Sequence, residues 1–107
     1  MITHLPSSIR VGAVRYDLER SDIPEESNRS AETTARNQKI RFGTTTTPRR
    51  MAECGLHELL HAIWFEYGIS DEDKEERTVN VLATGLAQVL QDLGVWPEEL
   101  RIEGEDG

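Results

Sequence analysis

The chain has 107 residues, of which 36% are hydrophobic, and a formal net charge of −8. Its length suits one small domain spanning residues 1–107, and its acidic balance argues against non-specific nucleic-acid binding, which needs a basic face. No apolar run approaches the roughly 18 residues of a membrane span, and the N-terminus lacks the apolar segment of a signal peptide. A lone cysteine, Cys54, excludes an internal disulfide and fits a reducing compartment. These features predict a cytoplasmic domain without a membrane or nucleic-acid partner.

The first part of the chain is predicted to form strands. Residues 1–8 are expected to be a disordered lead-in. From Ile9 to Leu18, apolar residues alternate with other residues, which is typical of a half-buried strand. The alternation changes phase midway, which predicts a bulge or bend beside Gly12. Residues 19–30 are rich in serine, proline and charge, and they are expected to form a loop.

Residues 31–43 have the pattern of a weak hairpin. Thr33-Thr34 favour a strand, and Arg36-Asn37 could form the turn, because asparagine tolerates the left-handed conformation. Ile40 and Phe42 then alternate with charged residues, as expected for a strand with one face on the core. The sequence therefore predicts three strands in all.

Two helices are predicted in the second half of the chain. Thr47 is a good N-cap and Pro48 suits the first helical position, so one helix should run from there to Tyr67 and end at Gly68. A second helix should begin near Ser70 and end at Gly94. Its apolar stripe of helical period comprises Val79, Leu82, Ala83, Leu86, Val89, Leu90 and Leu93.

The order of these elements predicts an α+β fold, in which a small three-stranded antiparallel sheet packs on a two-helix hairpin. Trp96, after the second helix, is expected to pack as a cap on a small core. Residues 102–107 are expected to be disordered, as chain ends often are.

The sequence His57-Glu58-Leu59-Leu60-His61 matches the pattern HExxH. Residues four apart lie on the same face of a helix, so the two imidazoles can bind one metal ion. Glu58 lies beside them, where its carboxylate can reach a water bound to that metal. Two histidine ligands with a carboxylate as general base are the arrangement of zinc peptidases. The pattern therefore predicts zinc held by His57 and His61, with Glu58 as the base.

The helix around this motif is apolar on nearly every side, which predicts that it is buried. Its apolar residues are Leu56, Leu59, Leu60, Ala62, Ile63, Trp64, Phe65 and Tyr67. Imidazole and carboxylate groups on a buried helix need partners, since an unpaired buried polar group costs about 2–7 kcal/mol. A metal ion would satisfy all three groups together. The alternative is a metal-free network of buried hydrogen bonds.

A third protein ligand is expected, because peptidase zinc sites use three and leave one position for water. The second helix is the best source, and a residue level with His61 should lie about as far from the turn as His61 does, roughly 10 Å. That distance points to Glu75 or Glu76 rather than Glu72. Glu75 lies nearer the centre of the apolar stripe, whereas Glu76 lies to one side, at a rim that water can enter. An ordinary solvated acid is the alternative for both, and it is expected for at least one of them.

The motif is followed in the second helix by Glu76-Arg77-Thr78-Val79-Asn80-Val81-Leu82-Ala83. Together they resemble the small zinc peptidases of phages and mobile elements, including the ImmA/IrrE family and other compact gluzincins. The family's second-helix pattern is matched by Glu76, Val79, Asn80 and Ala83. A wider resemblance to short phage-encoded HELLHAI proteins covers most of residues 9–93. It implies a zincin-like fold, Glu76 as the third ligand, and a phage or prophage protein in the host cytoplasm.

The resulting expectation is a zinc metalloendopeptidase that hydrolyses a protein or peptide substrate, with Glu58 carrying the proton from water to the leaving amine. In the relatives, an edge strand binds substrate by adding it to the sheet, and residues 39–43 are the candidate here. A histidine or tyrosine is expected to stabilise the oxyanion. His4, which should be exposed near the terminus, and Tyr67 are poor candidates for that role.

The alternative is a non-catalytic interaction protein on the same scaffold, in which zinc or a hydrogen-bond network only holds the two helices together. The fourth metal position distinguishes the two functions. A water there favours the enzyme, whereas Cys54, which lies on the same helix face as His57, would favour the structural role. A lone buried cysteine is more often a small apolar residue. Neither the substrate nor the oligomeric state follows from the sequence.

Overall fold

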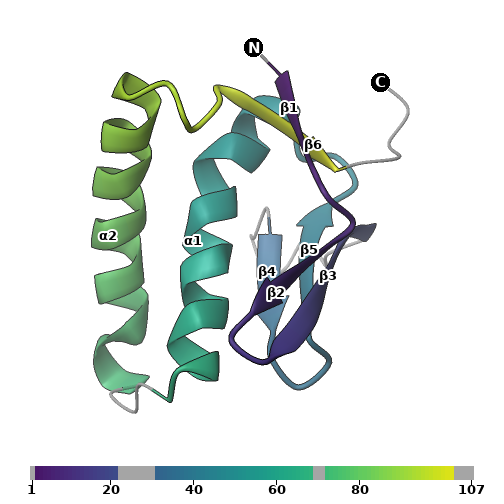
Figure 1. Ribbon diagram of the computed structural model, residues 1–107, viewed down its shortest axis with the longest axis vertical. Coiled ribbons are helices and arrows are strands. Elements are labelled where there is room, and N and C mark those ends of the chain that lie inside the picture. Colours follow the sequence, from purple (N-terminus) through teal and green to yellow (C-terminus); the bar gives the residue numbers. More distant parts are fainter. Residues whose placement is uncertain (1, 22–30, 69–71, 103–107) are drawn as a thin grey trace.

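The computed structural model describes residues 2–21, 31–68 and 72–102. In chain order the elements are β1 (Ile2–Leu5), β2 (Ser8–Val11), β3 (Val14–Ser21), β4 (Ala31–Thr34), β5 (Lys39–Gly43), α1 (Pro48–Glu66), α2 (Glu72–Asp92) and β6 (Glu99–Ile102). Figure 1 shows α1 as the central element, with α2 on one side and the strands on the other. The predicted α+β class is confirmed. Neither of the helices described is long and apolar enough to cross a membrane.

The strands form two sheets, so the prediction of one three-stranded antiparallel sheet is wrong. One sheet has the order β2-β3-β5-β4, and β1 pairs with β6 in a second sheet of two strands. The β2–β3 and β4–β5 pairs are antiparallel, whereas β3–β5 and β1–β6 are parallel. The parallel β3–β5 pair arises because β4 takes the outer position and the hairpin then brings β5 back beside β3.

The bulge expected beside Gly12 is instead the turn of a hairpin. Val11 pairs with Val14, so Gly12 and Ala13 form the connection between β2 and β3. Gly12 has a φ of 63°, which glycine adopts without steric cost. Paired residues across a hairpin face the same side of the sheet. The apolar positions therefore shift from Ile9 and Val11 to Val14 and Tyr16, which explains the change of phase in the sequence.

The two ends of the described chain meet, which contradicts the predicted disorder of residues 2–8 and of Ile102. β1 pairs with β6, and Ile102 and Leu100 on β6 are buried in the core. β6 lies close to α1 at Gly55, where an added Cβ would lie 3.2 Å from Leu100 Cδ1. Such pairing joins distant segments, so no local pattern in either strand announces it. Met1 and residues 103–107 lie outside the described residues.

Several local predictions are confirmed. Thr47 caps α1 by accepting a hydrogen bond from Arg50 N at 3.2 Å, and Gly68 follows the helix with a φ of 69°. The second hairpin forms as predicted from residues 31–43, although its left-handed residue is Gln38 rather than Asn37. The loop predicted for 19–30 begins later, because β3 continues to Ser21. Residues 22–30 and the expected helix start at Ser70 lie outside the described part.

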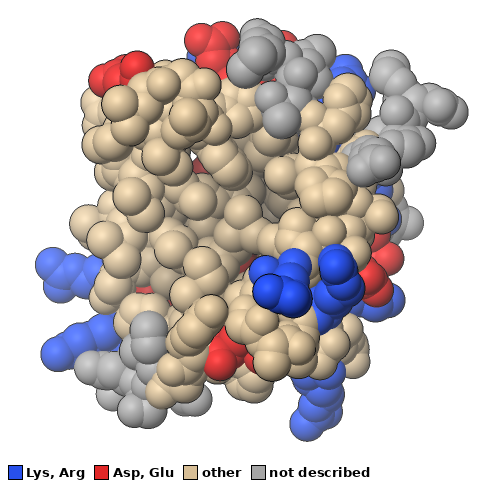
Figure 2. Space-filling view, in the orientation of Figure 1, with Lys and Arg blue, Asp and Glu red and all other residues tan. Residues whose placement is uncertain are grey.

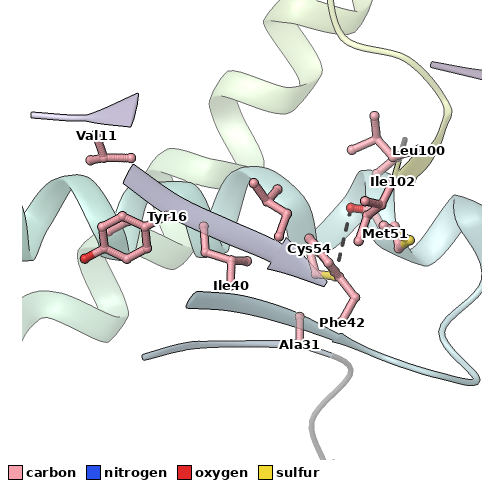
Figure 3. Close-up of a cluster of buried hydrophobic side chains, with 12 residues drawn as sticks. Val11, Tyr16, Ala31, Ile40, Phe42, Met51, Cys54, Leu100 and Ile102 are labelled. Atoms are coloured by element: carbon pink, nitrogen blue, oxygen red, sulfur yellow. Dashed lines mark hydrogen bonds between the residues drawn. The ribbon is translucent and has the colours of Figure 1, made fainter. Parts of the chain in front are cut away.

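The hydrophobic core lies between the four-stranded sheet, β6 and one face of α1. Figure 3 shows Tyr16, Ile40 and Phe42 from the sheet with Met51 and Cys54 from α1. Trp96 packs against this cluster, and its indole Nε1 donates a hydrogen bond to the carbonyl of Ala52 at 3.0 Å. Its predicted role as a cap on the core is therefore confirmed.

Both helices expose more apolar surface than the sequence predicts. Phe65 is 60% exposed and Tyr67 67%, so the expectation that α1 is buried all round is wrong. The reason is that the strands cover only one face of α1. The helix α2 packs mainly against α1 and covers only a neighbouring strip of it. Figure 2 shows a surface with few charged side chains over the two helices. Four residues of the predicted α2 stripe are exposed: Leu82, Leu86, Val89 and Leu93.

Tyr16 links the first hairpin to the end of α1. It is fully buried, and its hydroxyl donates a 2.6 Å hydrogen bond to Glu66 Oε2. We expect Tyr16→Phe to lower the free energy of unfolding by about 1.5–3 kcal/mol, the range for bonds to charged groups, as measured by urea denaturation. Tyr67→Phe, at an exposed position, is the control and should change it little. Equal losses in both variants would mean that the Glu66 contact contributes nothing.

The same contact makes stability sensitive to alkaline pH. Burial, and then the Glu66 carboxylate, raise the pKa of Tyr16 above its ordinary value of about 10. A raised pKa in the folded state means that stabilisation is fully present below about pH 10 and is lost as the pH rises towards the folded pKa. Unfolding of Tyr16→Phe should therefore lack this component of alkaline destabilisation.

Candidate metal centre

His57 and His61 present their imidazoles to the same point beside α1. They lie one helical turn apart, and their Nε2 atoms are 3.1 Å from each other. Their side chains are 18% and 16% exposed, so both rings lie at the edge of the packed interior. One metal ion could therefore be bound by both nitrogens.

Glu76 brings a carboxylate to both of these nitrogens. Its Oε1 lies 3.1 Å from His57 Nε2, and its Oε2 lies 2.9 Å from His61 Nε2. The three residues form a cluster whose ligand atoms all lie within 4.8 Å of one another. Among the described residues, this cluster is the group of side chains that could hold a metal ion. α2 supplies Glu76 because it runs back along α1 after a short connection. The side chain is 69% exposed, so the cluster opens to solvent.

Glu75 contacts His61 at its other ring nitrogen. Its Oε2 lies 2.6 Å from His61 Nδ1, and its side chain is 27% exposed. The expectation that at least one of Glu75 and Glu76 is an ordinary solvated acid is therefore wrong. A carboxylate on Nδ1 holds the proton on that nitrogen and leaves Nε2 free to bind a metal. The two acids thus occupy different nitrogens of one imidazole.

Glu58 is a buried carboxylate beside the cluster but not a member of it. It is 7% exposed, and its Oε1 accepts a 2.6 Å hydrogen bond from the hydroxyl of Thr33 on β4. Glu58 and His57 both line the same cleft. Sequence reasoning did not single out Thr33 beyond its preference for a strand. No local signal could have done so, because β4 and α1 meet only in the folded chain.

The cleft has a volume of about 860 Å³ and three walls. They are residues 31–33 of β4, the part of α1 between Arg50 and His61, and the part of α2 between Glu76 and Gln91. Opposite β4, the α2 wall presents uncharged polar side chains: Asn80, Thr84, Gln88 and Gln91. The candidate metal cluster therefore lies in a cleft whose α2 wall is largely polar.

No family model, curated protein or solved structure matches this chain. The case for a metal centre therefore rests on its own residues. A helix-borne pair of histidines, a carboxylate from a second helix and a buried carboxylate beside them meet at one cleft.

The edge of the sheet at the cleft is β4, not the predicted segment 39–43. β5 lies between β3 and β4, so its backbone groups are already paired on both sides. β4 is the outermost strand of this sheet among the described residues, and it lines the cleft. The correction follows from the parallel β3–β5 pairing, which places β5 inside the sheet.

Cys54 lines the cleft but behaves as a core residue. Its Sγ lies 4.0 Å from the carbonyl oxygen of Met51, and it does not belong to the metal cluster of the described residues. Burial raises the pKa of the Cys54 thiol to about 11. In this packing Cys54 is a small buried residue of the core and lies outside the described metal cluster.

The two poor candidates for oxyanion stabilisation remain poor. His4 on β1 and Tyr67 after α1 are exposed, and neither lines the cleft. The exposure predicted for His4 is confirmed.

Proposed function

We propose that the protein is a zinc-dependent peptidase, with zinc held by His57, His61 and Glu76. The observation that carries this proposal is the convergence of both Nε2 atoms on the Glu76 carboxylate. Two imidazoles and one carboxylate are a donor set of catalytic zinc sites, which keep a fourth position for water. The exposure of Glu76 fits that requirement, because solvent can reach the cluster.

The chemistry divides between the metal and Glu58. When bound, zinc lowers the pKa of a coordinated water to about 7 and polarises a carbonyl group. Glu58 accepts the proton of the attacking water and then gives it to the nitrogen of the leaving amine. The location of its carboxylate, buried in the wall of the cleft beside His57, suits this role. His61 is held by Glu75, which fixes the ring that faces the reaction.

The substrate in this proposal is an extended polypeptide. Its backbone would pair with β4, the outermost strand of the described sheet, in the mode by which edge strands bind peptides. The amide and hydroxyl side chains on the α2 wall would face it from the opposite side. Polypeptide backbone, rather than a particular side chain, is therefore the feature that the cleft recognises.

The direct test is hydrolysis of internally quenched fluorescent peptides of random sequence. The zinc-loaded protein should cleave some of them, a chelator should stop cleavage, and added zinc should restore it. The peptidase proposal would be overturned if the purified zinc-loaded protein cleaved none of the peptides and also failed to cleave an unfolded protein offered as substrate.

Glu76→Gln and Glu75→Gln separate the ligand from its neighbour. We expect Glu76→Gln to weaken zinc binding by more than about 100-fold, because it removes a ligand. Glu75→Gln should cost at most about 10–100-fold, the range for a residue that orients a ligand. Zinc affinity can be measured by competition with a chromophoric chelator. If Glu75→Gln loses zinc while Glu76→Gln retains it, the ligand is Glu75.

The second candidate is a non-catalytic interaction protein in which zinc links α1 to α2. It is favoured by the apolar surface that both helices leave exposed, since such surfaces often mark interaction sites. On this alternative, zinc removal would destabilise the fold, and the zinc-loaded protein would hydrolyse no peptide. The peptide assay therefore decides between the two.

A further inference from the structure

Thr33 makes two contacts with the same glutamate. Its Oγ1 lies 2.6 Å from Glu58 Oε1 and 3.0 Å from the backbone carbonyl oxygen of Glu58. A hydroxyl has one proton to donate and two lone pairs that accept. The shorter contact, to a carboxylate, is the charge-assisted one and takes the proton while Glu58 is ionised.

The position of Thr33 in the sheet makes this contact rigid. Ala31 and Thr33 lie two residues apart on β4, so their side chains point to the same face, and Ala31 is buried in the core. Thr33 is paired with Ile40 on β5, and Ile40 is fully buried. The hydroxyl therefore comes from a strand whose register is fixed by the core.

We propose that Thr33 is a positioning residue for the base, and that it holds Glu58 Oε1 so that the second carboxylate oxygen is left to accept the proton from water. This inference rests on the proposed peptidase function. It adds that β4, the strand expected to bind the substrate, also holds the base, so that one strand positions both the substrate and Glu58. Glu58 is held directly, and Thr33 touches no reacting atom.

The contact with Oε1 is compatible with both protonation states of Glu58. When the second carboxylate oxygen has taken a proton from water, Oε1 still has lone pairs, and Thr33 can continue to donate to it. When Glu58 gives its proton to the leaving amine, the hydrogen bond to Oε1 is unchanged. The Glu58 carbonyl oxygen, 3.0 Å from Thr33 Oγ1, is a second acceptor on the same residue. No proton is gained or lost by Thr33.

The test compares Thr33→Val, which keeps the shape but removes the hydroxyl, with Thr33→Ser, which keeps the hydroxyl. We expect Thr33→Val to lower kcat roughly 10- to 100-fold, because the base is misplaced, with KM and zinc content unchanged. Thr33→Ser should restore most of kcat. Thr45→Val makes the same chemical change at an exposed position between β5 and α1, outside the cleft, and is the control that should leave kcat unchanged. The assay uses the quenched peptide that the parent protein cleaves fastest.

A second measurement tests the contact without activity. In excess chelator, Thr33→Val should lower the urea midpoint of unfolding in the parent protein. In the Glu58→Met background, the same substitution should lower the midpoint less, because its partner is already absent. Equal decreases in both backgrounds would show that the two side chains are not coupled and would overturn the inference. A Thr33→Val enzyme as fast as the parent, or a Thr33→Ser enzyme as slow as Thr33→Val, would overturn it while leaving the peptidase proposal intact. If the parent protein cleaves no peptide, the peptidase proposal fails, and the catalytic role of Thr33 fails with it. A smaller effect of Thr33→Val in the Glu58→Met background would then still show that the two side chains interact.

Discussion

His57→Ala and His61→Ala should each yield protein without zinc. Their Nε2 atoms lie 3.1 Å apart and share the Glu76 carboxylate, so either change removes one of three ligands. We expect zinc affinity to fall by more than about 100-fold, beyond the effect of losing a residue that only orients a ligand. Zinc content is measured by atomic emission on protein purified without added metal, where the parent should hold about one zinc per chain.

Stability should follow the metal, because a ligand that binds only the folded state stabilises it. A chelator should lower the melting temperature of the parent protein but not that of His57→Ala. His4→Ala is the matched control, since His4 is the third histidine and is exposed on β1. It should retain zinc and respond to chelator as the parent does. A parent protein without metal, equally stable in chelator, would defeat both the enzymatic and the structural zinc proposals.

Glu58→Gln should strongly slow hydrolysis while zinc remains bound. The amide keeps the shape of the side chain, and its oxygen can still accept from Thr33, but it cannot carry a proton. Removal of a general base typically lowers the rate by 10²–10⁴-fold, and we expect kcat to fall in that range. Initial rates on the best quenched peptide, with zinc content measured on the same sample, give this result.

The control for this prediction is Glu98→Gln, which makes the same chemical change at an exposed position outside the cleft. It should retain full activity. If Glu58→Gln cleaves as fast as the parent, then Glu58 is not the base. If Glu58→Gln instead loses zinc, then the buried carboxylate supports the metal, and its loss of activity no longer identifies a base.

Much of the fold follows from local patterns. The N-cap at Thr47, the glycine after α1 and the alternation in β5 are all signals within a few residues, and the structure contains all three. The first hairpin was concealed because a two-residue connection looks like a change of phase within one strand. The β1–β6 pair was missed because each strand is short and its partner lies at the other end of the chain.

The candidate site divides in the same way. The convergence of His57 and His61 follows from the helical repeat alone, since residues four apart share a face. The contacts of Glu76, Glu75 and Thr33 do not, because each depends on how a second element packs against α1. The spacing along α2 limited the candidates for the third ligand to two adjacent acids. Only the packing of the two helices showed that Glu75 lies at Nδ1 of His61 and Glu76 at Nε2.

The sequence by itself determined which segments are helix and strand in the middle of the chain, and which imidazoles face one point. These properties depend on the backbone repeat and on capping groups, both of which act over a few residues. The tertiary structure decided that β4 is the outer strand, that Thr33 reaches Glu58, and that most of the α2 stripe is exposed. Those outcomes depend on contacts between distant segments, and an apolar stripe in a sequence does not state how much of it a single neighbouring helix will cover.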